Sequence, residues 1–458
     1  MVFSSLLFIF RFLPFALILY FIVPHRLKNV TLLILSLLFY SWGEPKYLLL
    51  MLASILVDYS ASLLIFYYRK NKFIKLCGLL ASILFNMGTL FFFKYASFFA
   101  TNINTLFGTH LPIVNYVLPL GISFYTFQTL SYTIDVYQGK VPAERNILTF
   151  ATFVTLFPQL IAGPIVKYTD INDALHHRKI SLYKIEEGLK YFVIGLGKKV
   201  LIANNIGSLW SEIQRIGFHR ISTPLAWLSI AAFSFQIYFD FSGYSTMAIG
   251  LGKILGFEFP QNFNFPYISR SITEFWRRWH ITLSSWFKEY VYIPLGGNRV
   301  GPLRLYLNLF IVWALTGLWH GASWNFVLWG LFFYIILSIE KSGLLYLLDQ
   351  MPIISHIYTI FLLLISWAIF STTDFTLLKA LFHRLFIWHY NTDFLYYLRS
   401  YFLTFCIAIT CSTKVPLLIH YHLQHHPWLM NLLYIAIFIL STAYLVDATY
   451  NPFLYFRF

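Results

Sequence analysis

Long apolar runs, repeated along the whole chain, are the feature that most limits what this sequence can fold into. Several of them approach or exceed the ~20 residues that a helix needs to cross the hydrocarbon core of a bilayer. Only 11% of the 458 residues are charged, against about 25% in an ordinary soluble domain. Strands of a membrane barrel would alternate apolar and polar residues, and the runs show no such alternation. The sequence therefore predicts an all-α, polytopic integral membrane protein.

Candidate membrane segments follow one another closely, and some of them are too short or too polar to cross fully. The candidate ranges are 6–23, 30–42, 47–67, 74–95, 113–136, 148–166, 187–206, 225–252, 303–319, 322–339, 354–371, 394–411 and 429–446. The range 148–166 holds two prolines and one glycine, so we expect a re-entrant or broken helix there. No internal repeat or soluble-domain linker interrupts the chain, which favours one membrane domain over residues 1–458.

Basic residues are divided unequally among the early loops. The loops at 25–28, 68–75 and 140–145 are basic, whereas those at 43–46 and 97–112 hold one lysine and no arginine. The positive-inside rule therefore predicts an N-terminus on the outer face, which is the periplasmic face of the inner membrane in a bacterium. The net charge of +15 then reflects cytoplasmic loops and anionic lipid, and we expect no nucleic-acid partner.

The segment RSITEFWRRWHITLSSWFKEYVYIPLGGNR at 270–299 is too charged to span a membrane. Ser271 is placed to cap a helix with Glu274 three positions on, and Glu274 and Arg278 are spaced to pair. Aromatic residues fall near one face and basic residues elsewhere, which predicts an amphipathic helix at the membrane interface. His280 lies inside this helix, where contact with water or lipid headgroups is the alternative to a functional role.

His320 stands in the middle of ALTGLWHGASWNFVLWG, an almost wholly apolar stretch at 314–330. Burying an imidazole in a membrane costs free energy because the ring loses its hydrogen bonds to water, which suggests a functional role for His320. A histidine can take a proton from a hydroxyl group and return it, so His320 is a candidate general base. The alternative is a packing histidine bonded to a neighbouring carbonyl group. Ser323 lacks the G-x-S-x-G elbow expected of a serine nucleophile.

Asp240 lies in the apolar run QIYFDFSGYSTMAIG at 236–250, and an intramembrane carboxylate is a functional candidate by default. Its alternative role is to pair with an arginine or a hydroxyl group. Lys198 and Lys199 are expected to mark a cytoplasmic helix end or a water-filled vestibule. Four histidines at 420–426 have no acidic or cysteine neighbour, so we expect a solvated loop and no metal site.

With these residues in view, the whole chain resembles the membrane-bound O-acyltransferase superfamily, and within it the bacterial alginate O-acetyltransferase (AlgI-like) branch. The matching stretches are FPQLIAGPIVKY (157–168), YFDFSGYSTMAIG (238–250), FWRRWHITLSSWFKEYVYIPLGGNR (275–299), GLWHGASWNFVLWG (317–330) and the terminal NPFLYFRF. Thr246 departs from the pattern, because an acidic residue is expected at its position.

The resemblance implies a ring of about 11–13 helices, some re-entrant or interfacial, around a central tunnel through the membrane. It implies a catalytic pair of His320 and His280. Residues expected to bind substrate or line the channel are Asp240, Trp319, Ser323 and Asn325. The implied reaction moves an acetyl group from a cytoplasmic donor, acetyl-CoA, to a periplasmic partner protein or directly to a polysaccharide.

Arg277, Arg278 and Lys288 are expected to bind the phosphates of coenzyme A, because guanidinium and ammonium groups pair well with phosphate. No permanently bound cofactor is expected. The acceptor would be alginate, another exopolysaccharide or peptidoglycan. Transfer of D-alanine to teichoic acid is an alternative reaction of the same class. A proton-coupled transporter or flippase is the alternative from another class, but the paired halves that transporters often show are not visible.

Overall fold

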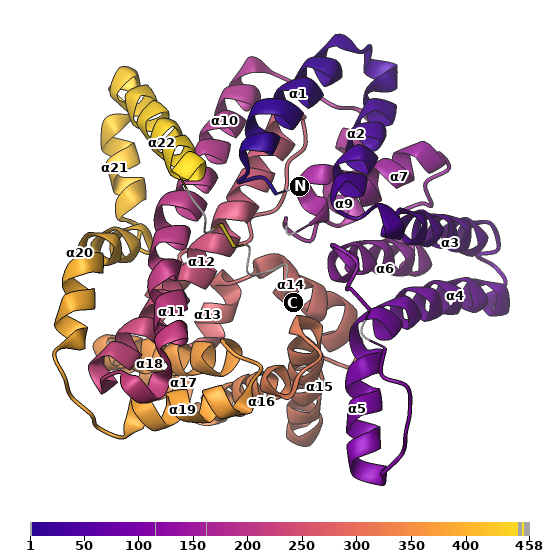
Figure 1. Cartoon of the computed structure of the whole chain (residues 1–458). Coiled ribbons are helices and arrows are strands. Elements are labelled where there is room, and N and C mark those ends of the chain that lie inside the picture. The colour runs from indigo at the N-terminus through magenta and orange to yellow at the C-terminus, as the bar shows by residue number, and fades with distance from the viewer. Residues whose placement is uncertain (1, 115, 162, 448–450, 453–458) are drawn as a thin grey trace. The chain divides into compact units, whose positions relative to one another are not determined.

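The structure, a computed structural model, describes residues 2–114, 116–161, 163–447 and 451–452. Every regular element within these ranges is a helix, as Figure 1 shows along the chain. Among the described residues, eight helical stretches are long and apolar enough to cross a membrane, so the predicted all-α, multi-pass class is confirmed. Residues 453–458, the end of the expected terminal motif, lie outside the described ranges. The ring of helices and its central tunnel stay predictions.

The eight candidate spans all overlap ranges that the sequence predicts. They are Pro45–Tyr67, Lys72–Phe107, Thr223–Ile254, Pro302–His320, Trp324–Gln350, Pro352–Phe370, Asp393–Cys411 and Pro427–Asp447. Other predicted ranges hold shorter helices. The apolar helix Phe8–Ile22 is short, α2 (Lys28–Gly43) has 16 residues, and α6 (Ile122–Gln138) begins well inside its predicted range.

The chain divides into two compact units. The first consists of Met1–Phe192 and Met247–Pro260, and the second of Val193–Thr246 and Gln261–Phe458. The predicted single domain over 1–458 stays a prediction. The remaining helices of the first unit are α1 (Leu13–Ile22), α3 (Leu48–Tyr67), α4 (Lys72–Leu90), α5 (Ala96–Phe107), α7 (Ile147–Thr155), α8 (Phe157–Leu160), α9 (Tyr168–His176) and most of α10 (Leu182–Gly197).

The second unit carries both candidate histidines. Its helices are α11 (Asn205–Ile216), most of α12 (Thr223–Ile254), α13 (Ile272–Arg278), α14 (Ile281–Phe287), α15 (Pro302–His320), α16 (Trp324–Ile339), α17 (Leu345–Gln350), α18 (Pro352–Phe370), α19 (Phe375–Phe386), α20 (Asp393–Cys411), α21 (Val415–Leu423) and α22 (Pro427–Asp447). Three π-helical segments extend or join these helices, namely η5 (Lys198–Asn204), η8 (Lys288–Tyr292) and η9 (Glu340–Leu344).

A polar cluster ties α3, α4 and α6 together inside the first unit. Both carboxylate oxygens of Asp58 accept from Nδ2 of Asn86 at 2.9 Å, and the hydroxyl of Ser82 also donates to this carboxylate. Thr129 of α6 donates to Oδ1 of Asn86 at 3.2 Å. Apolar burial drives helix association weakly in a bilayer, so such hydrogen bonds help to hold the helices in contact.

The expected broken helix at 148–166 is confirmed by the interruption between α7 and α8. Leu156 separates them with ψ 108°. The backbone N–H of Phe157 donates to Oγ of Ser36 at 3.1 Å, and Nε2 of Gln159 donates to the carbonyl of Phe153 at 2.5 Å. Side chains thus bond the backbone groups that the break releases, as an interrupted helix inside a membrane protein requires.

The segment 270–299 forms α13 and then α14 followed directly by η8, so the prediction of one continuous amphipathic helix is wrong. Its predicted start is confirmed, because Oγ of Ser271 accepts from the N–H of Glu274 at 3.0 Å. The predicted pair of Glu274 and Arg278 is also present, with 2.8 Å between Oε1 and Nη2. The chain then breaks at His280, whose φ of 43° and ψ of 54° lie in the left-handed region.

The aromatic residues of this segment also do not face lipid, as those of an interfacial helix would. Phe275, Trp279 and Trp286 are at most 6% exposed and pack inside the unit. The segment has the charge and aromatic pattern of a membrane-surface helix, but its aromatic residues are buried by tertiary contacts within the protein.

Candidate active site

The hairpin of α15 and α16 brings His320 into the interior of the second unit. Gly317 and Gly330 face each other across this hairpin. A Cβ atom on Gly317 would lie 2.5 Å from the carbonyl oxygen of Phe326, and one on Gly330 would lie 2.5 Å from that of Trp313. The two backbones therefore touch, as they do where small residues line contacts between membrane helices.

Aromatic rings surround the side chain of His320, which is 2% exposed. The imidazole centroid lies 5.0 Å from the ring of Trp319, 4.8 Å from that of Trp329 and 5.4 Å from that of Phe370. These rings come from α15, α16 and α18. His320 is thus buried inside the unit, whereas its depth in the membrane stays a prediction. Walls of this kind exclude water and strengthen any hydrogen bond that the imidazole forms.

His280 is fully buried, so the alternative of contact with water or lipid headgroups is wrong. Its Nδ1 lies 3.0 Å from Oδ1 of Asn262, which also accepts from the hydroxyl of Thr282 at 2.9 Å. Burial lowers the pKa of His280 to about 3, because a charged ring would lose its hydration. The imidazole is therefore neutral at physiological pH.

One tryptophan links the two histidines. The ring of Trp319 lies 5.9 Å from that of His280 and 5.0 Å from that of its neighbour His320, measured between centroids. Phe241 of α12 packs edge-on against His280 with 4.7 Å between centroids. The structure therefore brings together three of the predicted site residues, from the start of α14 and the end of α15.

Asp240 forms an ion pair rather than lining this cluster. Its Oδ1 lies 2.5 Å from Nζ of Lys199, and both side chains are 1% exposed. Lys199 also donates to the backbone carbonyl of Pro452. The expectation that Lys199 marks a helix end or a vestibule is wrong, because it serves a buried carboxylate. Its neighbour Lys198 donates to the hydroxyl of Thr246, the position where the resemblance expects an acidic residue.

Ser323 makes a local contact, whereas Asn325 makes a contact between two helices. Ser323 precedes α16 in extended conformation, and its backbone carbonyl accepts from the N–H of Phe326 at 3.2 Å. Asn325 is fully buried, and its Nδ2 donates to the carbonyl of Ile369 at 3.4 Å. Asn325 thus joins α16 to α18, whereas a contact of either residue with substrate stays a prediction.

The three residues expected to bind the donor differ in their exposure and in their pairing. Arg277 is exposed. Arg278 is held by Glu274 and donates to the carbonyl of Asn264 at 3.1 Å. Lys288 is exposed at the rim of a pocket of about 250 Å³ between α14, η8 and α15.

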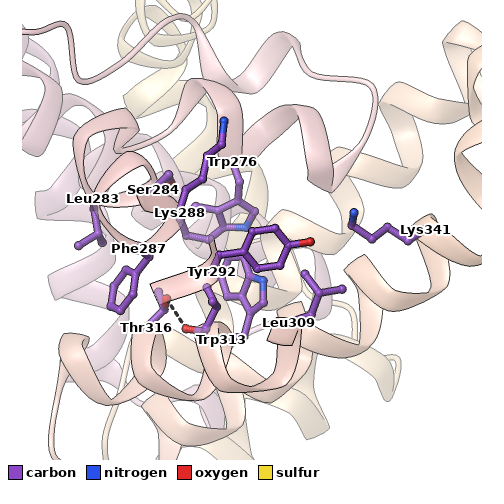
Figure 2. Close-up of a pocket in the computed structure, with 11 residues that line it drawn as sticks. Trp276, Leu283, Ser284, Phe287, Lys288, Tyr292, Leu309, Trp313, Thr316 and Lys341 are labelled. Carbon is purple, nitrogen blue, oxygen red and sulfur yellow. Dashed lines mark hydrogen bonds between the residues drawn. The ribbon is translucent and has the colours of Figure 1, made fainter. Parts of the chain in front are cut away.

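This pocket combines aromatic walls with two lysines, as Figure 2 shows. Its lining residues are Trp276, Leu283, Ser284, Phe287, Lys288, Tyr292, Leu309, Val312, Trp313, Thr316 and Lys341. Thr316 lies one helical turn before His320 on α15, and Ser284 lies one turn after His280. The rings of Trp276 and Trp329 are 5.7 Å apart, so a layer of tryptophans separates the pocket from His320.

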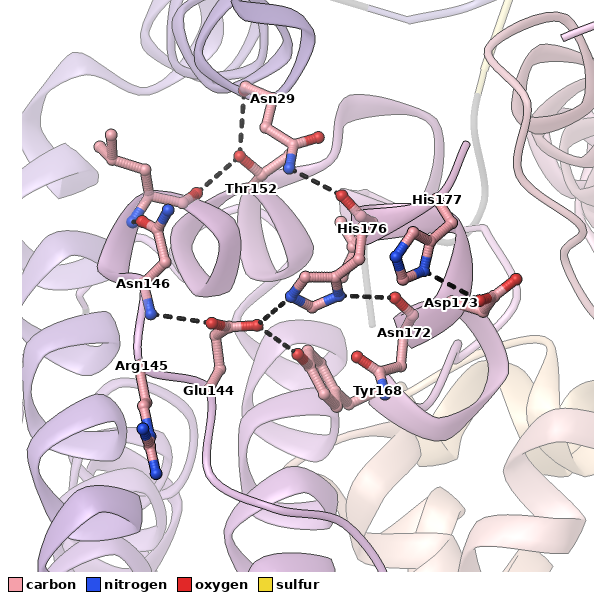
Figure 3. A network of polar contacts seen from close by, with 12 residues as sticks. Asn29, Glu144, Arg145, Asn146, Thr152, Tyr168, Asn172, Asp173, His176 and His177 are labelled. Carbon is pink, nitrogen blue, oxygen red and sulfur yellow. Dashed lines mark hydrogen bonds and ion pairs between the residues drawn. The ribbon is translucent and has the colours of Figure 1, made fainter. Parts of the chain in front are cut away.

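A second cluster of titratable residues lies in the first unit and is shown in Figure 3. Oε2 of Glu144 lies 2.9 Å from Nε2 of His176 and accepts from the hydroxyl of Tyr168 at 2.7 Å. Nδ1 of His176 lies 3.0 Å from the carbonyl of Asn172, so both ring nitrogens face acceptors. These bonds join α9 to the connection before α7, and we assign the cluster a structural role.

Three residues shape the site through partners that the sequence analysis did not foresee. Lys199 balances Asp240, Asn262 holds His280, and Glu340 fixes the start of α13. The carboxylate of Glu340 accepts from the N–H groups of Ile272 and Thr273 at 2.7 and 2.8 Å. Each pairing joins residues far apart in the chain. An ionisable residue within or beside an apolar stretch was the sequence signal that could have pointed to Lys199 and Glu340. The sequence around Asn262 offered no such signal.

Comparison with known proteins decides the family. Residues 141–344, which include both histidines, match the model of the membrane-bound O-acyltransferase family. Over 391 residues the chain is 41% identical to the probable alginate O-acetylase AlgI of Pseudomonas aeruginosa, covering 84% of this chain and 75% of that protein. The chain belongs to the membrane-bound O-acyltransferase family. It is a multi-pass membrane protein and an O-acyltransferase.

Other members of the family share less of the chain. The peptidoglycan O-acetyltransferase of Helicobacter pylori is 40% identical over 382 residues, covering 75% of this chain and 71% of that protein. The teichoic acid D-alanyltransferase of Streptococcus thermophilus is 29% identical over 246 residues, with coverage of 49% and 57%. All of these relatives are named as acyl-transfer enzymes, which favours the enzyme over the transporter alternative.

Proposed function

We propose that this O-acyltransferase passes an acetyl group from cytoplasmic acetyl-CoA across the inner membrane for O-acetylation of an exported or cell-wall polysaccharide. The buried arrangement of His280 and His320 around Trp319 carries this proposal. The relatives support the choice of acetyl, because those named for acetylation cover most of the chain at 40–42% identity. D-alanyl transfer is less favoured, since the relatives named for it cover only about half.

The reaction requires a base for the acceptor hydroxyl. In the proposed step, the imidazole of His320 takes the hydroxyl proton while the oxygen attacks the thioester carbonyl carbon. The carbon–sulfur bond then breaks, and the leaving thiolate takes the proton from the imidazolium. The aromatic walls keep water away from the thioester, which suppresses its hydrolysis.

The pocket beside the histidines is the proposed site for the donor. A nucleotide with several phosphates cannot enter hydrocarbon, so it needs cations at the protein surface. Lys288 and Lys341 supply two of them at the pocket rim, and Arg277 adds a third exposed cation. Arg278 is less suited, since Glu274 already neutralises it. The pantetheine arm would extend along the face of α15 that carries Thr316, and it reaches His320 only if the tryptophan layer between the pocket and His320 opens.

The remaining parts of the proposal concern topology and the acceptor. The loop charges favour a periplasmic N-terminus, with the basic loops in the cytoplasm. The acetyl group would leave the protein on the periplasmic side, where a partner acetyltransferase or the glycan itself receives it. Alginate and peptidoglycan are the acceptors that the relatives' names support, and the proposal also includes other exopolysaccharides.

The test is the acetyl ester content of surface glycans in cells that carry only a variant of this gene. His320→Ala should lower the content at least about 100-fold, the usual contribution of a general base, while the protein still accumulates in the membrane. His280→Ala should also lower it strongly. His420→Ala, at an exposed position on α21, is the matched control and should leave it unchanged. Near-normal content with His320→Ala would refute the proposed chemistry.

A further inference from the structure

The carbonyl oxygen of one buried asparagine receives three hydrogen-bond donors beside the candidate site. Oδ1 of Asn262 lies 3.0 Å from Nδ1 of His280, and it accepts from the hydroxyl and the N–H of Thr282 at 2.9 and 3.3 Å. Asn262 is 1% exposed and His280 is fully buried. The orientation of this amide therefore bears on which ring nitrogen carries the hydrogen.

The amide orientation follows from the backbone of Thr282. A backbone N–H can only donate, so the atom of Asn262 that faces it must be the oxygen. A reversed amide would point its NH₂ group at that N–H and lose the bond. The same oxygen faces Nδ1 of His280, and an amide oxygen can only accept. Nδ1 must therefore carry a hydrogen and donate it to Asn262.

Backbone hydrogen bonds keep this geometry in place. The N–H of Ile281 donates to the carbonyl of Asn262, and the N–H of Asn264 donates to the carbonyl of Arg278, both at 2.9 Å. They join the stretch 262–264 to the break between α13 and α14. The left-handed backbone of His280, unusual for a residue with a Cβ atom, turns its ring toward Asn262.

We infer that Asn262 is a positioning residue that fixes His280 as the tautomer with hydrogen on Nδ1, so that Nε2 is the accepting nitrogen of the ring. This inference rests on the proposed acyl transfer. It assigns a direction to His280: Nε2 accepts a hydrogen bond and does not donate one. His320 takes the hydroxyl proton in the proposed step, so Nε2 of His280 serves as a hydrogen-bond acceptor while the Nδ1–H bond to Asn262 persists.

The tautomer matters because the ring is neutral. With its pKa lowered by burial, His280 does not carry hydrogens on both nitrogens at physiological pH. Which nitrogen holds the single hydrogen then decides whether the reacting side accepts or donates. Without Asn262, the hydrogen is free to move to Nε2, and the ring would present a donor where an acceptor is needed.

The direct test is nitrogen NMR of the full-length protein in lipid, labelled with ¹⁵N-histidine, with the His280 signals assigned by their loss in His280→Gln. The expected wild-type spectrum has a protonated-type Nδ1 and an unprotonated-type Nε2. Asn262→Ala should move both signals toward the opposite tautomer. Asn262→Asp keeps an oxygen at the same place, so it should retain the wild-type tautomer. A wild-type ring protonated on Nε2 would overturn the inference.

Kinetics test the positioning role. Asn262→Ala should lower kcat on the order of 10- to 100-fold, as loss of a partner that orients a functional histidine does, with little change in KM for the donor. Asn262→Asp should recover part of this loss. Asn264→Ala is the matched control, because that side chain is exposed and only its backbone makes the contacts described. Its kcat should stay at the wild-type value.

The outcomes separate this inference from the proposed function. Wild-type kcat in Asn262→Ala would refute the positioning role while leaving acetyl transfer intact. A wild-type protein that transfers no acetyl group but shows the Nδ1–H tautomer would refute the proposed function and leave the tautomer standing.

Discussion

Nζ of Lys199 lies 2.5 Å from Oδ1 of Asp240, and neither side chain is more than 1% exposed. A buried pair of this kind is costly to desolvate, but it is costlier to leave one charge without its partner. The pair connects η5 with α12, and the next residue of α12, Phe241, packs against His280. Asp240 therefore lies next to a residue that contacts the site, and its ion pair with Lys199 has a structural role.

Breaking this ion pair should destabilise the protein strongly. Asp240→Asn and Lys199→Met should each cost about 3–5 kcal/mol, because each leaves a buried charge uncompensated. The double variant should be more stable than either single variant. Thermal unfolding in detergent measures this. Lys190→Gln is the control, since the pair of Lys190 with Glu186 is exposed and worth less than about 1 kcal/mol. Additive losses in the double variant would contradict the expectation.

The contact between α15 and α16 should tolerate no side chain at Gly317. The Cβ atom of Gly317→Ala would meet the carbonyl oxygen of Phe326 at 2.5 Å, and backbone atoms cannot move aside cheaply. We expect a loss of about 1–3 kcal/mol and a fall in acetyl transfer, since the hairpin places His320. Gly88→Ala in α4 has nothing within 4 Å and should be neutral or slightly stabilising. Full activity of Gly317→Ala would show that the close approach is dispensable.

The lysines at the pocket rim should govern donor affinity. Lys288→Gln and Lys341→Gln should each raise KM for acetyl-CoA about tenfold and change kcat little, because each removes one charge-assisted bond to phosphate. Lys379→Gln, an exposed lysine of α19, serves as control. Donor dependence of transfer by the purified protein is the measurement. A loss confined to kcat would remove this pocket as the donor site.

The predicted orientation can be read by cysteine labelling. The native cysteines Cys77, Cys406 and Cys411 must first be replaced by serine, since two of them are exposed. In intact cells an impermeant thiol reagent should then label His110→Cys but not Lys72→Cys. Permeabilised cells should label both, which controls for access. Labelling of Lys72→Cys in intact cells would reverse the topology.

The stability of the fold should depend on pH through His280. Its folded pKa, lowered to about 3, lies below the unfolded value of ~6.5, so only the unfolded state takes up this proton between those limits. Stability should therefore fall as pH drops below ~6.5, by up to about 1.4 kcal/mol per pH unit. His280→Gln should lose less stability than wild type between pH 7 and about 4.5 by thermal unfolding. Equal losses would contradict this contribution.

The sequence alone determined the class, most of the membrane spans, the family and the burial of His320. These features depend on local quantities, namely the length of an apolar run, a cap such as Ser271 with Glu274, and a motif within one stretch. The physical reason is that a bilayer demands about 20 apolar residues in a row for each crossing helix, which the chain displays without reference to its neighbours.

Only the tertiary structure decided the surroundings of those residues. Asn262 meets His280, Lys199 meets Asp240, and Glu340 meets the start of α13 across chain separations that no periodicity records. The break at His280 also depends on residues outside the segment. Backbone hydrogen bonds to the stretch 262–264 hold His280 in a left-handed conformation, which the helical pattern of 270–299 does not predict. Buried polar groups must find partners wherever packing supplies them, and that choice belongs to the folded chain as a whole.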